Sequence, residues 1–209
     1  MSKMPLIKIC GQTHASSVEN SLALGAHFIG FIFHNSSPRA ISPARAAAIR
    51  TRFARRVGVF VRQGAQDILK IMQQANLHYA QFHGRQTIED ARQIGPERVI
   101  RVFWPQACAS VDELQQQLDA WAPFCAYFLL DAGCVPGSGG TGKALDVSQL
   151  ASLRFPRPWL LAGGLSAANL REVLSQCTPD GVDLNTGVEL APGLKHASLI
   201  LAALRALTL

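Results

Sequence analysis

Eight short apolar runs alternate with segments of helical spacing along the 209 residues of the chain. A β-then-α alternation of this kind is typical of a parallel sheet covered by helices. Eight such units in this length favour an α/β fold built as a (β/α)8 TIM barrel, and a flavodoxin-like fold with extra units is the alternative. The strand-like runs are Leu6–Cys10, His27–Phe33, Arg56–Val61, Tyr79–Phe82, Val99–Phe103, Ala126–Leu130, Trp159–Ala162 and Gly181–Leu184.

Helix-like segments follow these runs in order. The sixth, Ala144–Leu153, is short. No linker, low-complexity stretch or sharp charge boundary divides the chain, so we expect a single barrel domain over residues 1–209. The other predicted helices are Ser16–Leu24, Pro43–Phe53, Gln66–Ala75, Thr87–Ile94, Val111–Trp121, Ala167–Ser175 and Leu194–Leu207.

The cysteines and apolar stretches exclude several classes of protein. No apolar stretch reaches the ~18 residues that a membrane span requires. The first residues carry no apolar segment followed by a small-residue cleavage site, so we expect a cytoplasmic protein. The cysteines are odd in number and never spaced as CxxC, which argues against a disulfide framework and against a structural zinc site. They are Cys10, Cys108, Cys125, Cys134 and Cys177.

The net charge of +6 raises the question of a nucleic-acid partner. The basic residues are dispersed, and exposed aromatic residues do not accompany a basic face. We therefore expect no nucleic-acid partner, although a modest positive field suits a small anionic substrate. The one dense basic group is predicted to be a solvated helix face; it consists of Arg45, Arg50, Arg52, Arg55 and Arg56.

Four reactive side chains come at or just after the ends of different strand-like runs: Cys10, Arg39, His83 and Asp131. In a closed parallel barrel those ends open on one face, so we expect the four to converge on one pocket, which predicts an enzyme. A carboxylate and a thiol would supply an acid and a base, and an arginine could grip a carboxylate. The alternatives are a packed thiol, a surface arginine and a merely polar strand-end histidine.

Alternation along the first strand predicts one interior contact. Lys8 and Cys10 share a face, so the thiol has a lysine below it on the inner side of the barrel. The eighth strand neighbours the first in a closed barrel, and Asp183 is placed to pair with Lys8 there. The alternative is a lysine that reaches solvent through the mouth or floor of the barrel.

Three glycine-rich turns follow later runs. The loop at 137–143 resembles a nucleotide P-loop, but Ala144 stands where the Mg²⁺-binding Ser or Thr is required, so a glycine-rich lid over the pocket or an inert loop is favoured. Gly163 and Gly164 follow the seventh run, and Asn185 and Thr186 follow the eighth. Barrel enzymes often bind a phosphate between those two loops, so this pair predicts a phosphate site.

The order of these motifs resembles the phosphoribosylanthranilate isomerase family almost from end to end. The resemblance implies an Amadori rearrangement in tryptophan biosynthesis without metal or organic cofactor. The segments that carry it are Lys8–Gly11, Gly30–Phe33 with Ser37–Arg39, Val57–Val61, Gln81–Gly84, Leu129–Ala132 with Gly139–Gly142, Leu161–Leu165, and Gly181–Asp183 with Gly187–Glu189 and Pro192–Gly193.

The resemblance also implies roles for individual residues. Asp131 is the general acid and Cys10 the general base. Arg39 holds the substrate's anthranilate carboxylate, and His83 lines the pocket. The remaining substrate-binding residues belong to the glycine-rich loops, which receive the phosphate or cover the substrate; they are Gly140, Gly163, Gly164, Asn185 and Thr186.

The chain departs from the family pattern at two places. Asn185-Thr186 stands where the family usually has two small hydroxyl residues, and His196 stands where it has an acidic residue. The nearest rival is the aminoaldose isomerase of histidine synthesis, whose first catalytic strand ends in an aspartate rather than in a residue like Cys10. We expect a monomer or a homodimer that acts on a small molecule and binds no membrane.

Overall fold

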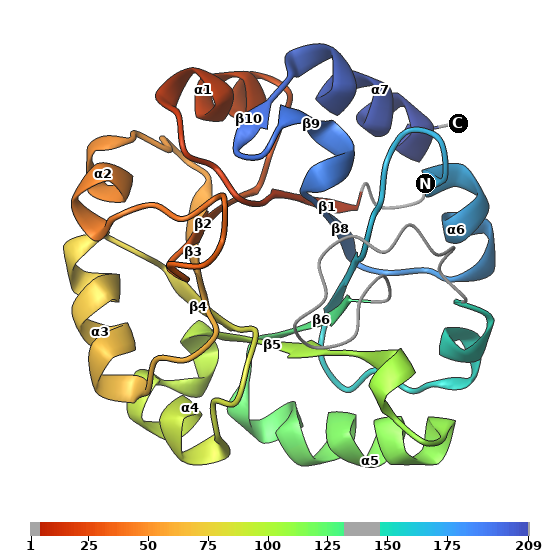
Figure 1. The fold of residues 1–209 in the computed structure, drawn as a ribbon. Helices are drawn as coiled ribbons and strands as arrows, with labels where there is room; N and C mark the ends of the chain where they lie inside the picture. Colours follow the sequence, from red (N-terminus) through yellow and green to blue (C-terminus); the bar gives the residue numbers. More distant parts are fainter. Residues whose placement is uncertain (1–4, 132–146, 209) are drawn as a thin grey trace.

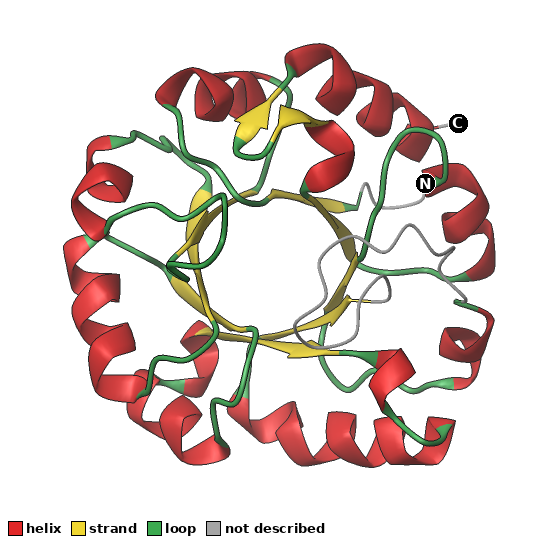
Figure 2. Cartoon of the chain, in the orientation of Figure 1, coloured by secondary structure: helices red, strands yellow, loops and turns green. Residues whose placement is uncertain are grey.

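The computed structural model describes residues 5–131 and 147–208. Eight parallel strands follow one another around a closed barrel, in which β1 pairs with both β2 and β8. Figures 1 and 2 show the ring of strands with helices on its outside. The (β/α)8 barrel is confirmed, and every strand lies within one residue of its predicted bounds. The strands are β1 Leu6–Ile9, β2 Phe28–Ile32, β3 Arg55–Phe60, β4 Tyr79–Phe82, β5 Val99–Phe103, β6 Tyr127–Asp131, β7 Trp159–Ala162 and β8 Gly181–Leu184.

The α-helices of the described residues cover the outer face of the barrel (Figure 1). They bury one apolar side each against the strands, in a core that surrounds the sheet. No helix within residues 5–131 and 147–208 is long and apolar enough to cross a membrane. The helices are α1 Ala15–Ala23, α2 Pro43–Ala48, α3 Ala65–Gln74, α4 Ile88–Ile94, α5 Val111–Trp121, α6 Leu170–Gln176 and α7 Ala197–Thr208. Short 3-10 helices are η1 Pro96–Arg98, η2 Pro105–Ala107, η3 Ala122–Phe124, η4 Ser148–Ser152 and η5 Thr186–Val188.

The prediction of a solvated arginine face is wrong for Arg56. Helix α2 ends at Ala48 instead of continuing to Phe53, and Arg56 lies in β3 with only 6% of its surface exposed. Its guanidinium donates hydrogen bonds to the carbonyl oxygens of Ala46, Ile49 and Ala75 at 2.5, 2.7 and 3.0 Å. Three carbonyl acceptors thus replace water around this cation, which joins the end of α2 to β3 and to the end of α3.

Three other predicted helices also differ from the structure, and the first of these differences is that α6 begins at Leu170 rather than at Ala167. Residues Leu194–Lys195, expected in the last helix, form β10, which pairs antiparallel with β9 at Glu189–Ala191. The turn of this hairpin contains Gly193 with a φ of +83°, a value that favours glycine. In the sixth connection, residues 147–158 contain the 3-10 helix η4, and residues 144–146 of the predicted helix lie outside the described part of the chain.

Aromatic rings fill the barrel at the amino ends of its strands. Phe28, Tyr79 and Tyr127 are the first residues of β2, β4 and β6, and their ring centroids lie 5.7 to 6.0 Å apart in edge-to-face contacts. The fourth alternate strand, β8, begins with Gly181, where a Cβ would lie 2.5 Å from a Leu160 methyl carbon. Because this layer closes the floor, a substrate can reach the interior only from the carboxyl ends of the strands.

We predict that Arg56→Met destabilises the barrel by about 2–4 kcal/mol, because the carbonyl groups of Ala46, Ile49 and Ala75 lose a buried donor. Urea denaturation followed by circular dichroism measures the loss as a lower midpoint at unchanged slope. The matched control is Arg50→Met, at an exposed position. Equal midpoints for the two variants would show that the Arg56 contacts contribute nothing to stability.

Candidate active site

A buried ion pair lies inside the barrel, toward the carboxyl ends of β1 and β8. Lys8 on β1 and Asp183 on β8 are paired in register, and Lys8 Nζ lies 2.8 Å from Asp183 Oδ2. The side chain of Lys8 is 0% exposed and that of Asp183 is 7% exposed, so the predicted interior pair is confirmed. Burial lowers the pKa of Lys8, but the negative charge of Asp183 and the hydrogen bond to it contribute to a net rise, so the ammonium stays charged.

The thiol of Cys10 lies directly above this pair at the end of β1. The backbone N–H of Cys10 donates to the carbonyl of Leu184 at 2.9 Å, and the residue is 4% exposed. Gly30 on β2 leaves room for it, because a Cβ there would lie 2.8 Å from Cys10 Sγ and 3.2 Å from Lys8 Nζ. Burial raises the pKa of Cys10, and the Lys8 charge opposes that rise. A neutral resting thiol with a cation beside it can become a base.

His83 and Asp131 come together on neighbouring parts of the same mouth. Asp131 is the last residue of β6, and its Oδ2 lies 3.9 Å from His83 Nε2. Burial, together with the positive charge of Lys8, lowers the pKa of His83 to about 4. The imidazole is therefore neutral at neutral pH, and its ring packs perpendicular to that of Trp104, with the ring centroids 5.3 Å apart. A neutral His83 can share a hydrogen bond but supplies no counter-charge to Asp131.

Gln81 is a site residue that the sequence analysis did not single out. It is 2% exposed, and its Oε1 is buried without a hydrogen-bond partner among the described residues. Strand alternation along β4 places it on the same face as His83, and in the sequence Gln81 belongs to a motif of the family pattern without any other signal of a site residue. An unpaired buried acceptor beside the pocket fits a donor on a bound ligand.

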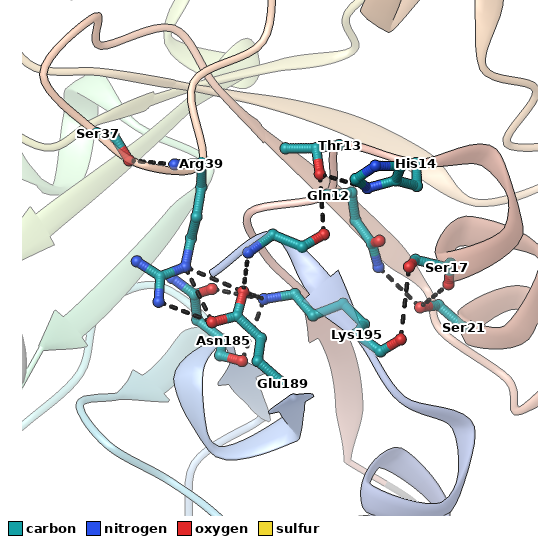
Figure 3. Close-up of polar contacts among 11 residues, drawn as sticks. Gln12, Thr13, His14, Ser17, Ser21, Ser37, Arg39, Asn185, Glu189 and Lys195 are labelled. Carbon is teal, nitrogen blue, oxygen red and sulfur yellow. Dashed lines mark hydrogen bonds and ion pairs between the residues drawn. The ribbon is translucent and has the colours of Figure 1, made fainter. Parts of the chain in front are cut away.

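The Arg39 side chain forms an ion pair with Glu189 of the β9–β10 hairpin. Its Nη2 donates to Glu189 Oε2 at 2.7 Å, and its Nε lies 3.0 Å from both carboxylate oxygens (Figure 3). The side chain is 16% exposed, so the alternative of a free surface arginine is wrong. Lys195, from the same hairpin, donates to Glu189 Oε1 at 2.6 Å. Neither Glu189 nor Lys195 was singled out from the sequence.

The turns after β7 and β8 lie against each other. Gly163 and Gly164 have φ values of +106° and +69°. A Cβ at Gly187, in the turn after β8, would lie 2.1 Å from the carbonyl oxygen of Leu165, so only glycine allows this approach. Thr186 begins η5 in that second turn. The structure thus brings the two predicted phosphate-binding turns together, whereas Gly140 lies outside the described residues.

Asn185 and His196, the two departures from the family pattern, both have partners within the protein. Asn185 Oδ1 accepts a hydrogen bond from Lys195 Nζ at 2.6 Å. His196 lies just before α7, where its carbonyl accepts from the amides of Leu199 and Ile200 and its ring nitrogen lies 2.7 Å from Ser198 Oγ. His196 therefore caps the last helix.

Comparisons with known proteins agree with this geometry. The family described as N-(5'phosphoribosyl)anthranilate (PRA) isomerase matches residues 7–206. An N-(5'-phosphoribosyl)anthranilate isomerase of Desulfovibrio desulfuricans is 50% identical over 95% of this chain and 93% of its own. The crystal structure of phosphoribosyl anthranilate isomerase from Thermotoga maritima is 33% identical to this chain and has a TM-score of 0.86. The match covers 98% of this chain and 99% of the other. The chain belongs to the phosphoribosylanthranilate isomerase family.

A second solved isomerase of this family is described as a complex with reduced 1-(o-carboxyphenylamino)-1-deoxyribulose 5-phosphate. It is 29% identical to this chain, with a TM-score of 0.81, and the match covers 98% of this chain and 99% of the other. The resemblance that the sequence motifs carry is thus confirmed at the level of the family and the fold.

We predict that Lys8→Met raises the pKa of the Cys10 thiol, because the variant loses the cation that opposes burial. The ultraviolet absorbance of the thiolate, followed against pH and corrected with Cys10→Ala, reports this pKa. In the wild-type enzyme the alkaline rise of kcat/KM should follow the same titration. Lys70→Met removes an exposed lysine and serves as the control. An unchanged thiol titration in Lys8→Met would contradict the assignment.

Proposed function

We propose that this chain converts N-(5-phosphoribosyl)anthranilate into 1-(2-carboxyphenylamino)-1-deoxyribulose 5-phosphate, the Amadori rearrangement of tryptophan biosynthesis. The observation that carries the proposal is the arrangement of Cys10 over the charged Lys8 at the end of β1, with Asp131 at the end of β6. The family match over residues 7–206 supports the same reaction. A thiol rather than an aspartate at the end of β1 favours it over the aminoaldose isomerase of histidine synthesis.

Asp131 acts as the general acid. Its carboxyl group gives a proton to the ribose ring oxygen, the C1–O bond breaks, and the substrate opens to a Schiff base of the anthranilate nitrogen. His83 Nε2 lies 3.9 Å from Asp131 Oδ2, and because the imidazole is neutral it adds no positive charge of its own beside this carboxyl group. Asp131 returns to its charged form after the transfer and regains a proton before the next turnover.

Cys10 acts as the general base. The thiol first releases its proton to solvent, and the thiolate so formed removes the proton from C2′. The electron pair of that C–H bond forms the double bond of an enolamine, which neutralises the Schiff base. The enolamine tautomerises to the ketone product, so the reaction needs proton transfers only and no external oxidant or reductant. The Lys8 ammonium stabilises the thiolate while it exists.

The two anionic ends of the substrate are assigned to two sides of the mouth. The guanidinium of Arg39 receives the anthranilate carboxylate. The backbone N–H groups around Gly163, Gly164, Asn185 and Thr186 receive the phosphate, in turns whose glycines let the backbone approach an anion. Gly140 is proposed to contribute from the glycine-rich loop.

The catalytic unit is proposed to be one barrel domain over residues 1–209 that uses no metal or organic cofactor. Its proposed location is the cytoplasm. It works as a monomer or a homodimer. One Thermotoga maritima relative, 29% identical with a TM-score of 0.82, is described as a dimeric isomerase from which monomers were generated, which supports a homodimer and indicates that the barrel of that relative can also be obtained as a monomer.

We predict that Cys10→Ala lowers turnover of freshly prepared phosphoribosylanthranilate by about 10²–10⁴-fold, because a positioned base contributes that much. The loss of substrate fluorescence measures the rate, and an unchanged circular dichroism spectrum shows that the barrel still folds. If Cys10→Ala kept near-normal turnover, the base would have to be reassigned, with His83 as the next residue to test.

We predict that Asp131→Asn damages turnover as much as the loss of Cys10, because an amide keeps the shape of the carboxyl group but cannot deliver its proton. Affinity for a reduced product analogue should be largely kept, since the loss belongs to the transition state. Isothermal titration gives the affinity, and the fluorescence assay gives kcat. A loss confined to affinity would make Asp131 a binding residue.

A further inference from the structure

A buried cluster of charges lies beside the mouth of the barrel and is shown in Figure 3. Its centre is the Glu189 carboxylate on β9, which is 3% exposed. Four donors meet it: Arg39 Nε and Nη2, Lys195 Nζ, and the backbone N–H of Gly193 at 2.9 Å. Burial raises the pKa of Glu189, but the hydrogen bonds from Arg39 and Lys195 outweigh burial and lower it, so the carboxylate is ionised.

Lys195 connects the same carboxylate to the turn after β8. Its side chain is 0% exposed, and Nζ donates to Glu189 Oε1 at 2.6 Å, to Asn185 Oδ1 at 2.6 Å and to the Asn185 carbonyl at 3.1 Å. An ammonium has three N–H groups, so these three acceptors use its whole donor capacity. Lys195 is therefore a brace inside the protein and has no donor left for a ligand.

Gly11 brings this cluster against the backbone next to the thiol. It has a φ of +69°, and a Cβ there would lie 2.7 Å from Asn185 Oδ1 and 2.8 Å from Arg39 Cδ. Both side chains thus pack over the residue that directly follows Cys10. A shift of the Arg39 side chain or of Asn185 would therefore displace the backbone next to Cys10, the proposed base.

The charges of the cluster leave one edge of Arg39 for a ligand. Two cations share one carboxylate, so a single positive charge is uncompensated within the cluster. Arg39, at 16% exposure, is the member that reaches the mouth, and its Nη1 has no acceptor among the described residues. A guanidinium held by its Nε–Nη2 edge presents the opposite edge in a fixed plane, which is the geometry that a carboxylate accepts.

We propose that Glu189 is a positioning residue of the isomerase reaction, which holds the Nε–Nη2 edge of Arg39 so that the opposite edge meets the substrate's carboxylate, while Lys195 ties Glu189 to Asn185. This inference rests on the proposed function. Glu189 touches no reacting atom and acts through Arg39. The hairpin that carries it sets the recognition of the anthranilate end of the substrate.

The experiment compares Glu189→Gln with wild type on two substrates. One is phosphoribosylanthranilate, and the other is N-(5-phosphoribosyl)aniline, which lacks only the carboxylate. The glutamine side chain keeps the shape but turns an amide group toward the arginine. We expect KM for phosphoribosylanthranilate to rise about tenfold or more, with a smaller change in kcat, and kinetics on the aniline substrate to stay within about twofold of wild type.

Two controls separate positioning from a general structural effect. Glu172→Gln removes one negative charge at an exposed position of α6 and should leave KM unchanged for both substrates. In the Arg39→Met background, Glu189→Gln should add no further rise in KM, because a residue that acts through Arg39 has nothing left to position. If Glu189→Gln does not fold, Glu189→Asp keeps the charge with a shorter reach and should show the same substrate difference at smaller size.

The outcomes distinguish the two proposals. Wild-type protein that does not consume phosphoribosylanthranilate would overturn the proposed function and this inference with it. An active wild type whose Glu189 variants lose equal activity on both substrates would overturn only the positioning role, because a structural defect does not depend on the carboxylate. Additive losses from Arg39→Met and Glu189→Gln would overturn it too.

Discussion

The Lys8–Asp183 ion pair is the interaction on which the arrangement of the mouth depends. It joins β1 to β8, the strands that close the barrel, and it places a charge in a space that water cannot reach. Taking two charges out of water is expensive, and removal of one partner leaves the other uncompensated. The pair therefore marks the boundary between the apolar layer at the amino ends of the strands and the polar interior at their carboxyl ends. It also sets the electrostatic surroundings of Cys10.

Charge is distributed unevenly around the mouth. The cations Lys8, Lys195 and Arg39 lie on the side of β1 and the loops next to it, whereas Asp131 lies at the end of β6 beside a neutral imidazole. The cations on the β1 side stabilise the thiolate of the proposed base, whereas the neutral imidazole of His83 adds no charge of its own beside the proposed acid, Asp131. The floor of aromatic rings keeps both groups at the open end of the barrel.

Much of this arrangement could be predicted from the sequence, because alternation along a strand and closure of a barrel fix which residues share a face. Both rules place Lys8 opposite Asp183 and put the reactive residues at one end. The Arg39–Glu189 pair could not be predicted in this way. Its partners are 150 positions apart, and the helical spacing of Leu194–Leu207 concealed the hairpin that carries Glu189. Arg56 was misassigned because carbonyl partners from distant turns leave no trace in local sequence.

The same electrostatics explain why a thiol suits the end of β1. The buried Lys8 already has one counter-charge in Asp183, and Asp183 raises the pKa of any acid placed beside it. An aspartate at position 10 would place a second buried carboxylate beside that of Asp183, and the repulsion between the two like charges would favour protonation of one of them. Cys10 is neutral when buried at rest, so the site carries the additional negative charge only while the thiol acts as a base. Lys8 can then stabilise a thiolate during turnover without having to compensate two permanent anions.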